Sequence, residues 1–314
     1  MSQRKFRKVL VAVKPWQRTL PLAAEHARFL AQDLKAEVRL VTCIFDAQVA
    51  FGLSHDEPSA MSAQAGLIQN CRRELDKSVK KLRDSGISVS AEVLWDQPIY
   101  EGLLREVRDW GADLLVVGVH RTRPIGHARL GDMDWQLLRH APCPLLIVKG
   151  SSFDGYRAIV AAVDPLQGHA EPAGLDREVL AAAREIGRAS HAEVYAANAY
   201  PDPANYAWAS SVEVLPGIFY GPEHMQSLHR KAVAELVGEY GIAPSRIDLR
   251  PGQPAPVIAD VVAQRRAQLV VLGAVRHGRL QQVLLGSTAE AVVEDVDCDI
   301  LLVKLSGAES DALR

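Results

Sequence analysis

Residues 270–290, VVLGAVRHGRLQQVLLGSTAE, decide the fold because the same pattern occurs twice in the chain. Residues 115–135 read LVVGVHRTRPIGHARLGDMDW, and the glycines Gly118 and Gly131 there match Gly273 and Gly286 in the later copy. Each copy begins like a buried strand, has one glycine at the turn and has the second where a helix begins. Glycines at such places are components of phosphate-binding loops.

The duplication extends over most of the chain. Three further pairs of segments match at offsets of 150 to 156 residues: CPLLIVK from Cys143 with CDILLVK from Cys298, AEVRLVTCIFDA from Ala36 with AEVYAANAYPDP from Ala192, and VLVAVK from Val9 with IVAAVD from Ile159. Two copies are too few for a solenoid, and 314 residues are typical of two domains. We therefore predict domains at 1–150 and 155–305, joined by a linker at 150–156 and followed by a flexible polar tail at 306–314.

Apolar runs alternate with helix-like segments in both halves. The predicted strands are 9–13, 38–45, 88–95, 113–118 and 144–149, then 158–163, 192–200, 246–250, 268–273 and 299–304. Helix periodicity marks 21–34, 61–84, 98–110 and 131–140, and composition rich in Pro, Gly and Ser predicts long loops at 46–60 and 200–222. Nearly continuous Val/Leu/Ile strands alternating with helices indicate a parallel sheet covered on both faces. The prediction is an α/β fold of two tandem five-stranded domains.

Composition excludes several classes of function. The formal net charge of −2 gives no general attraction to nucleic acid or to an anionic membrane. The four cysteines show no CxxC spacing, which argues against a disulfide framework or a structural zinc site. No apolar run is long enough for a membrane helix, so we expect a cytoplasmic protein without membrane insertion.

Ligands of open parallel sheets bind at the carboxyl ends of the strands. In the second half, Asp164 follows the first strand, Gly273 ends the fourth, and Gly286-Ser287-Thr288 opens a helix. Ser287 with Glu290 three residues later matches a capping box. A helix N-terminus also suits a phosphate, so the capping and the binding interpretations are compatible.

The first half differs at the corresponding places. Asp132 replaces Ser287, and it would cap the helix but place a carboxylate where a phosphate would bind. Like charges at about 4 Å repel by about 4 kcal/mol at an effective dielectric constant near 20. Lys14 replaces Asp164, so a donor stands where the second half has an acceptor. We predict that the first site is degenerate and does not bind phosphate.

These residues resemble the universal stress protein (Usp) family, in its tandem-domain, UspE type. The family pattern is similar to Gly-x2-Gly-x9-Gly-[Ser/Thr] with an Asp ending the first strand, and GSTAE at 286–290 and APCPLLIV at 141–148 match typical family strings. The resemblance implies Rossmann-like domains of the adenine nucleotide alpha hydrolase-like class. It also implies a non-enzymatic stress-response factor, with weak ATP hydrolysis left open, that binds ATP or AMP with Mg²⁺ in the second domain. The implied binding residues are Asp164, Gly273, Arg276, Gly286, Ser287 and Thr288.

The resemblance further implies an internal pseudo-dimer that pairs through the last strands, 144–149 and 299–304, and it leaves a homodimer open. One departure concerns the second glycine of the pattern, which is Arg276 in the second half and Arg121 in the first. Arg276 either closes over the phosphates as a clamp or fills the pocket and excludes them. Gly278, two residues later, could supply the missing flexibility.

The sequence shows no catalytic constellation, because His120, His127 and His277 have no nucleophile or carboxylate at a recognisable spacing. The segment 200–220 gathers Tyr and Phe residues and one Trp in a chain that is only 6% aromatic. Such a segment is typical of a pocket for an apolar molecule, but also of a lid that packs on its own domain or on a partner. A carrier or sensor of an apolar or lipid-like molecule, and a scaffold without a small-molecule ligand, are therefore alternative functions.

Overall fold

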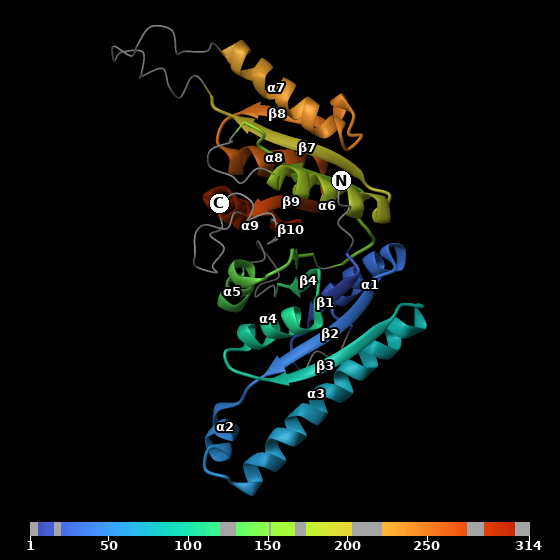
Figure 1. Ribbon diagram of the computed structural model, residues 1–314, viewed down its shortest axis with the longest axis vertical. Helices are drawn as coiled ribbons and strands as arrows, with labels where there is room; N and C mark the ends of the chain where they lie inside the picture. The colour runs from blue at the N-terminus through green and yellow to red at the C-terminus, as the bar shows by residue number, and fades with distance from the viewer. Residues whose placement is uncertain are drawn as a thin grey trace, which may run out of the picture. The chain divides into compact units, whose positions relative to one another are not determined.

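The computed structural model describes residues 6–15, 20–119, 130–150, 152–166, 174–202, 222–274 and 286–304. The chain divides into two compact units, with the boundary in sequence between Gly155 and Tyr156. Each unit is described by itself below and is drawn in Figure 1.

The first domain is a parallel sheet with helices. Its strands lie in the order β3-β2-β1-β4-β5, and β1 lies between β2 and β4, since Val9 is in register with Val38 on one side and Leu114 on the other. Its described elements are β1 (Lys8–Ala12), α1 (Leu22–Leu34), β2 (Glu37–Ile44), α2 (Ala47–Leu53), α3 (Pro58–Asp84), β3 (Val89–Trp95), α4 (Ile99–Trp110), β4 (Leu114–Gly118), α5 (Asp132–His140) and β5 (Leu145–Val148).

The second domain repeats this topology. Its strands lie in the order β8-β7-β6-β9-β10 and are parallel, with β6 between β7 and β9. Its described elements are β6 (Ala158–Ala162), α6 (Leu175–Ser190), β7 (Glu193–Tyr200), α7 (Pro222–Gly238), η2 (Pro244–Arg246), β8 (Ile247–Pro251), α8 (Pro254–Arg265), β9 (Leu269–Ala274), α9 (Ser287–Asp295) and β10 (Asp299–Lys304). The predicted α/β class and parallel sheets are confirmed.

The sheet topology places the candidate sites. In the first domain, α1 and α3 cover one face of the sheet, whereas α4 and α5 pack together on the other (Figure 1). The inner strands are buried on both faces, which explains their continuous apolar sequences. Strand order reverses between β1 and β4, and equally between β6 and β9. The carboxyl ends of these strand pairs are the switch points where ligands of such sheets bind.

The loop predicted at 46–60 is wrong, because this stretch contains α2 and the beginning of α3. The Asp46 carboxylate accepts hydrogen bonds from the N–H groups of Gln48 and Val49 at 2.9 and 3.0 Å, which starts α2. Gly52 then lets α2 approach α3, since an added Cβ would lie 2.6 Å from the Cβ of Ala60. The glycine that suggested a loop is therefore a helix-packing residue.

Two other predictions concern segments outside the described residues. Of the predicted loop at 200–222, residues 203–221 are not described, and α7 begins at Pro222. The predicted tail at 306–314 is also not described. Among the helices in the described ranges, none combines the length and the apolar character needed to cross a membrane.

Candidate functional site

Asp164 lies just beyond β6, at the switch point of the second domain. Its Oδ1 atom is buried and has no hydrogen-bond partner among the described residues. Its backbone N–H donates to Oδ1 of Asp176 at 3.0 Å. Burial raises the pKa of the Asp164 carboxyl, while His229, the N–H of Leu166 and Asn198 lower it. One oxygen of this carboxyl group, Oδ1 of Asp164, is thus buried without a hydrogen-bond donor among the described residues.

A chain of two buried hydrogen bonds, which we call the Asn198–His229 chain, holds the backbone just before Asp164. Asn198 on β7 donates from Nδ2 to the carbonyl of Val163 at 2.8 Å, and its Oδ1 lies 2.9 Å from Nδ1 of His229 on α7. Because this amide oxygen can only accept, Nδ1 of His229 carries the proton. Asn198 is 1% and His229 is 5% exposed, and burial lowers the pKa of the His229 imidazole. Asn198 on β7 therefore holds the end of β6, and His229 on α7 orients Asn198.

The first turn of α6 closes the other side of this strand end. The helix has 16 residues against 13 in α1, although both end in equivalent left-handed caps, at His191 and Lys35. The additional turn supplies Leu175, whose side chain would lie 2.7 Å from a Cβ added at Gly273. The close packing of Leu175 thus explains why position 273 is a glycine. A contact between Gly273 and a ligand stays a prediction.

The same turn of α6 supplies a second carboxylate. Asp176 accepts the N–H of Asp164, and burial raises its pKa to about 6, with a smaller contribution from the nearby Asp164 charge. Two carboxylates therefore lie close together at the end of β6.

The helix α9 begins differently from the prediction. Its N-cap is Gly286 in extended backbone, Ser287 is its first helical residue, and no side chain caps it. The predicted capping box with Ser287 as the cap is wrong, because Ser287 lies one residue too late. Gly286 and Ser287 are exposed, and a Cβ added at Gly286 would meet nothing within 4 Å. Among the described residues, nothing therefore fills the space beside this helix N-terminus, where N–H groups have no intrahelical partner.

The equivalent helix of the first domain, α5, has a partner for its N-cap. Gly131 is the N-cap, and Asp134 accepts its N–H through Oδ2 at 2.9 Å. The prediction that Asp132 caps this helix is wrong, because Asp132 is the first helical residue. Burial raises the pKa of Asp134, whereas the Gly131 N–H and the charge of Lys14 lower it. Two carboxylates, Asp132 and Asp134, thus lie in the first turn of α5, and the degeneracy of this site stays a prediction.

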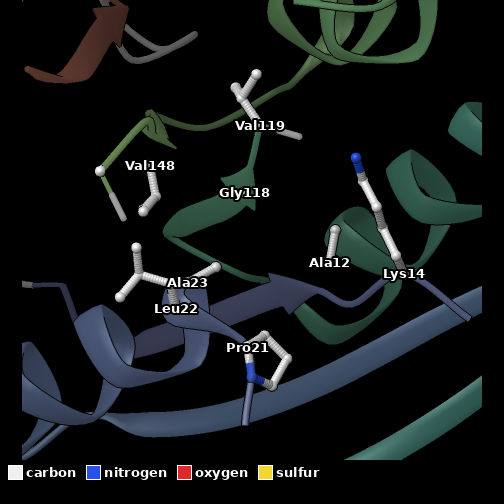
Figure 2. Close-up of a pocket in the computed structure, with 9 residues that line it drawn as sticks. Ala12, Lys14, Pro21, Leu22, Ala23, Gly118, Val119 and Val148 are labelled. Carbon is white, nitrogen blue, oxygen red and sulfur yellow. The ribbon is translucent and has the colours of Figure 1, made fainter. Parts of the chain in front are cut away.

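The first domain has a cavity at its switch point. Its volume is about 90 Å³, and Figure 2 shows the residues around it. Gly118 does not touch a bulky neighbour as Gly273 does, since an added Cβ would lie 3.6 Å from the Cβ of Ala23. The lining residues are Ala12, Lys14, Pro21, Leu22, Ala23, Gly118, Val119, Val148 and Gly150.

Several predicted residues lie outside the described ranges: Arg276, Arg121, Gly278, His120, His127 and His277. Of the predicted binding residues that are described, Asp164 and Gly273 lie at the carboxyl ends of strands, whereas Gly286, Ser287 and Thr288 lie at the start of α9. The unpaired Asp164 oxygen and the open helix start fit an adenine nucleotide, which would bring donors and an anion. Among the described residues, no group of three metal-ligating side chains could hold an ion by itself.

Sequence reasoning missed Leu175, Asp176, Asn198 and His229. A signal exists for two of them. Asn198 interrupts the apolar run of its strand, and His229 lies at helical spacing from the buried residues Val233 and Val237. Polar residues at core positions usually have hydrogen-bond partners.

Two doubly wound parallel domains of the same topology define a Rossmann-like α/β protein of tandem type. The sequence model of the universal stress protein family matches residues 5–149 and 155–304, so the chain belongs to this family, in its tandem-domain, UspE type. It is similar to universal stress protein E of Escherichia coli K12, with 28% identity over 306 residues, which cover 95% of this chain and 94% of the relative.

Solved structures show the same fold. A putative universal stress protein of Pseudomonas aeruginosa UCBPP-PA14 superimposes with a TM-score of 0.72 at 23% identity, covering 99% of this chain and 98% of the other. A universal stress protein of Archaeoglobus fulgidus gives a TM-score of 0.65 at 15% identity, covering 96% and 98%. At these identities the likeness concerns the fold alone.

Proposed function

We propose that the protein is a non-enzymatic stress-response factor whose second domain binds an adenine nucleotide, ATP or AMP. The observation that carries this proposal is the buried Oδ1 of Asp164, which has no hydrogen-bond partner among the described residues. A buried acceptor without a donor destabilises the fold by about 1–3 kcal/mol, and the exocyclic amine of adenine would supply the donor. The family resemblance assigns the base to this same residue.

The start of α9 would receive the phosphates. Gly286 and Ser287 are exposed, Thr288 is half-buried, and no side chain caps the helix. The positive end of a helix dipole attracts anions, and free N–H groups donate to them. Mg²⁺ would arrive with the nucleotide and reduce its negative charge.

The test is calorimetric titration of Mg·ATP and of AMP into the full-length protein. We expect a dissociation constant on the order of 1 μM. Asp164→Ala should weaken the binding of both nucleotides by about tenfold or more, because it removes the acceptor for the base. Ser287→Asp should weaken Mg·ATP most, since it places a carboxylate beside the phosphates.

The matched control is Asp132→Ser, at the equivalent first helical position of the other domain. It should leave nucleotide affinity unchanged. Absence of heat with the wild type, or equal losses in Ser287→Asp and Asp132→Ser, would contradict binding in the second domain.

The sequence predicts two alternative roles for Arg276: a clamp over the phosphates, or a side chain that fills the pocket. Arg276→Gly restores the family pattern. If the arginine clamps the phosphates, this change should weaken Mg·ATP binding, and if it fills the pocket, the change should strengthen it. Either result assigns the residue.

Other sequence predictions stay predictions: the pairing of the two domains through their last strands, a homodimer, and a cytoplasmic location. The alternative of a carrier or sensor for an apolar or lipid-like molecule rests on residues 200–220. Only Tyr200 to Asp202 of that segment are described.

A further inference from the structure

The cavity of the first domain is lined by aliphatic side chains, by backbone polar groups and by a single cationic side chain. Pro21, Leu22 and Ala23 at the start of α1 lie on one side, and Val119 and Val148 lie on others (Figure 2). Lys14 stands across the cavity from Val148. We propose that this cavity binds a small aliphatic monocarboxylate, with the carboxylate on Lys14 and the alkyl group against the apolar wall.

The charge of the site selects the class of ligand. Lys14 is half-exposed, and no hydrogen bond or ion pair joins it to another described residue. Its ammonium therefore needs an acceptor from solvent or from a ligand. The start of α1 adds a second attraction for an anion, because Pro21 precedes it and no side chain caps it, although Glu25 in its first turn weakens this attraction.

The surroundings argue against phosphate in this position. Asp132 and Asp134 occupy the first turn of α5, and the charge of Lys14 acts on Asp134. A dianion would meet repulsion from these carboxylates, whereas a monoanion meets less of it. The remaining lining side chains are aliphatic, so they offer an alkyl group an apolar contact among the backbone polar groups.

The size of the cavity limits the ligand. A cavity of about 150 Å³ holds a benzene molecule, and this one measures about 90 Å³. Acetate and propionate therefore fit within it. Butyrate, which has as many non-hydrogen atoms as benzene, fits only with its carboxylate outside, beside the half-exposed Lys14, and longer acids would extend beyond the described lining. At the corresponding place in the second domain, Leu175 packs against Gly273, whereas no such bulky side chain lies beside Gly118. The shape of the cavity thus differs from that of the duplicated position.

The experiment is a titration of the full-length protein with sodium butyrate at constant ionic strength, followed by NMR of labelled Leu, Val and Ala methyl groups. We expect the methyl signals of Leu22, Ala23, Val119 and Val148 to shift together, with a dissociation constant on the order of 1 mM. Butyramide, which has the same shape without the charge, should bind about tenfold more weakly or not at all.

Two variants localise the interaction. Lys14→Met keeps the length of the side chain and removes its charge, so it should reduce butyrate affinity by about tenfold. The matched control is Lys35→Met, an exposed lysine at the other end of α1, which should change nothing. Ala23→Leu should fill the cavity and abolish the shifts; if it does not fold, Lys14→Met still decides the proposal.

A series of unbranched carboxylic acids of increasing length distinguishes a small free acid from the carboxyl end of a longer acyl chain. Affinity should rise from acetate to butyrate and then stay level. A continued rise through octanoate would overturn the assignment of a small ligand. Equal affinity for butyrate and butyramide, an unchanged affinity in Lys14→Met, or shifts confined to the second domain would overturn the proposed site.

Discussion

The two domains place residues of opposite character at the same point of the same topology. Asp164, an acceptor, follows the first strand of the second domain, and Lys14, a donor, follows the first strand of the first domain. The longer α6 fills the space beside Gly273 with Leu175, whereas the space beside Gly118 is a cavity. The topology therefore fixes where a candidate site lies, while one helical turn and one charge reversal distinguish the residues placed there.

The domains also differ in how they hold the end of the first strand. Thr42 on β2 donates to the carbonyl of Val13 at 3.1 Å, and its counterpart Asn198 donates to that of Val163 at 2.8 Å. Only Asn198 has a second buried partner in the described structure, the imidazole of His229. The second domain therefore depends more strongly on a single polar side chain.

The largest expected effect on stability concerns the Asn198–His229 chain. Asn198→Leu leaves the carbonyl of Val163 and Nδ1 of His229 without partners, so it should destabilise the second domain by about 3 kcal/mol. Thr42→Val leaves one carbonyl unpaired and should cost the first domain about 1 kcal/mol. Hydrogen exchange in urea, resolved by mass spectrometry, measures each domain separately, because a two-domain chain need not unfold in one step. Equal losses of stability in the two variants would show that the Asn198–His229 chain does not stabilise the second domain.

A smaller difference is expected at the strand-end glycines. Gly273→Ala puts a Cβ 2.7 Å from the Leu175 side chain, so it should destabilise the second domain by about 2 kcal/mol. Gly118→Ala makes only an ordinary contact with Ala23 and should change the stability of the first domain by less than about 0.5 kcal/mol. The same exchange experiment compares the two. Leu175→Ala in the Gly273→Ala background should restore part of the loss if the clash is its cause.

The smallest effect on stability concerns pH. The pKa of Asp176 is about 6 in the folded chain, above its ordinary value of 3.8. Since the folded state holds this proton more tightly, stability falls as the pH rises from about 4 to 6 and the penalty is complete above that range. Discounted for partial exposure, it amounts to about 1–2 kcal/mol. Asp176→Asn should therefore stabilise the second domain at neutral pH and lose this advantage near pH 4.

The control for this prediction is Asp132→Asn, an exposed carboxylate at the start of α5 for which no such difference is expected. Stability curves measured for both variants between acid and neutral pH make the comparison. A constant offset between Asp176→Asn and the wild type across this range would contradict the raised pKa as the cause.

The sequence predicted the strands well, because buried parallel strands read as unbroken apolar runs, and four of the five strands in each half match a segment of the other half. It failed at 46–60, where Gly52 and Pro58 suggested a loop although Asp46 caps a helix there. The glycine in α2 serves a close contact with Ala60, which only the assembled fold shows.

For the candidate site, the sequence predicted the place of Asp164 just after the first strand of its domain, but its role as a binding residue stays a prediction. The contributions of Leu175, Asp176 and His229 arise from tertiary contacts that no spacing along the chain reveals. The caps of α5 and α9 were misplaced by one residue, because a glycine can be an N-cap without any side-chain signal.

The central claim is that the two sites bind different ligands, with the nucleotide confined to the second domain. The most direct test is a titration with Mg·ATP followed by amide NMR of the full-length protein. The account predicts shifts at Asp164 and at Gly286 to Thr288, with the signals of Gly131 and Asp132 unchanged. Shifts at the start of α5 equal to those at α9, or no shift at either helix, would contradict it.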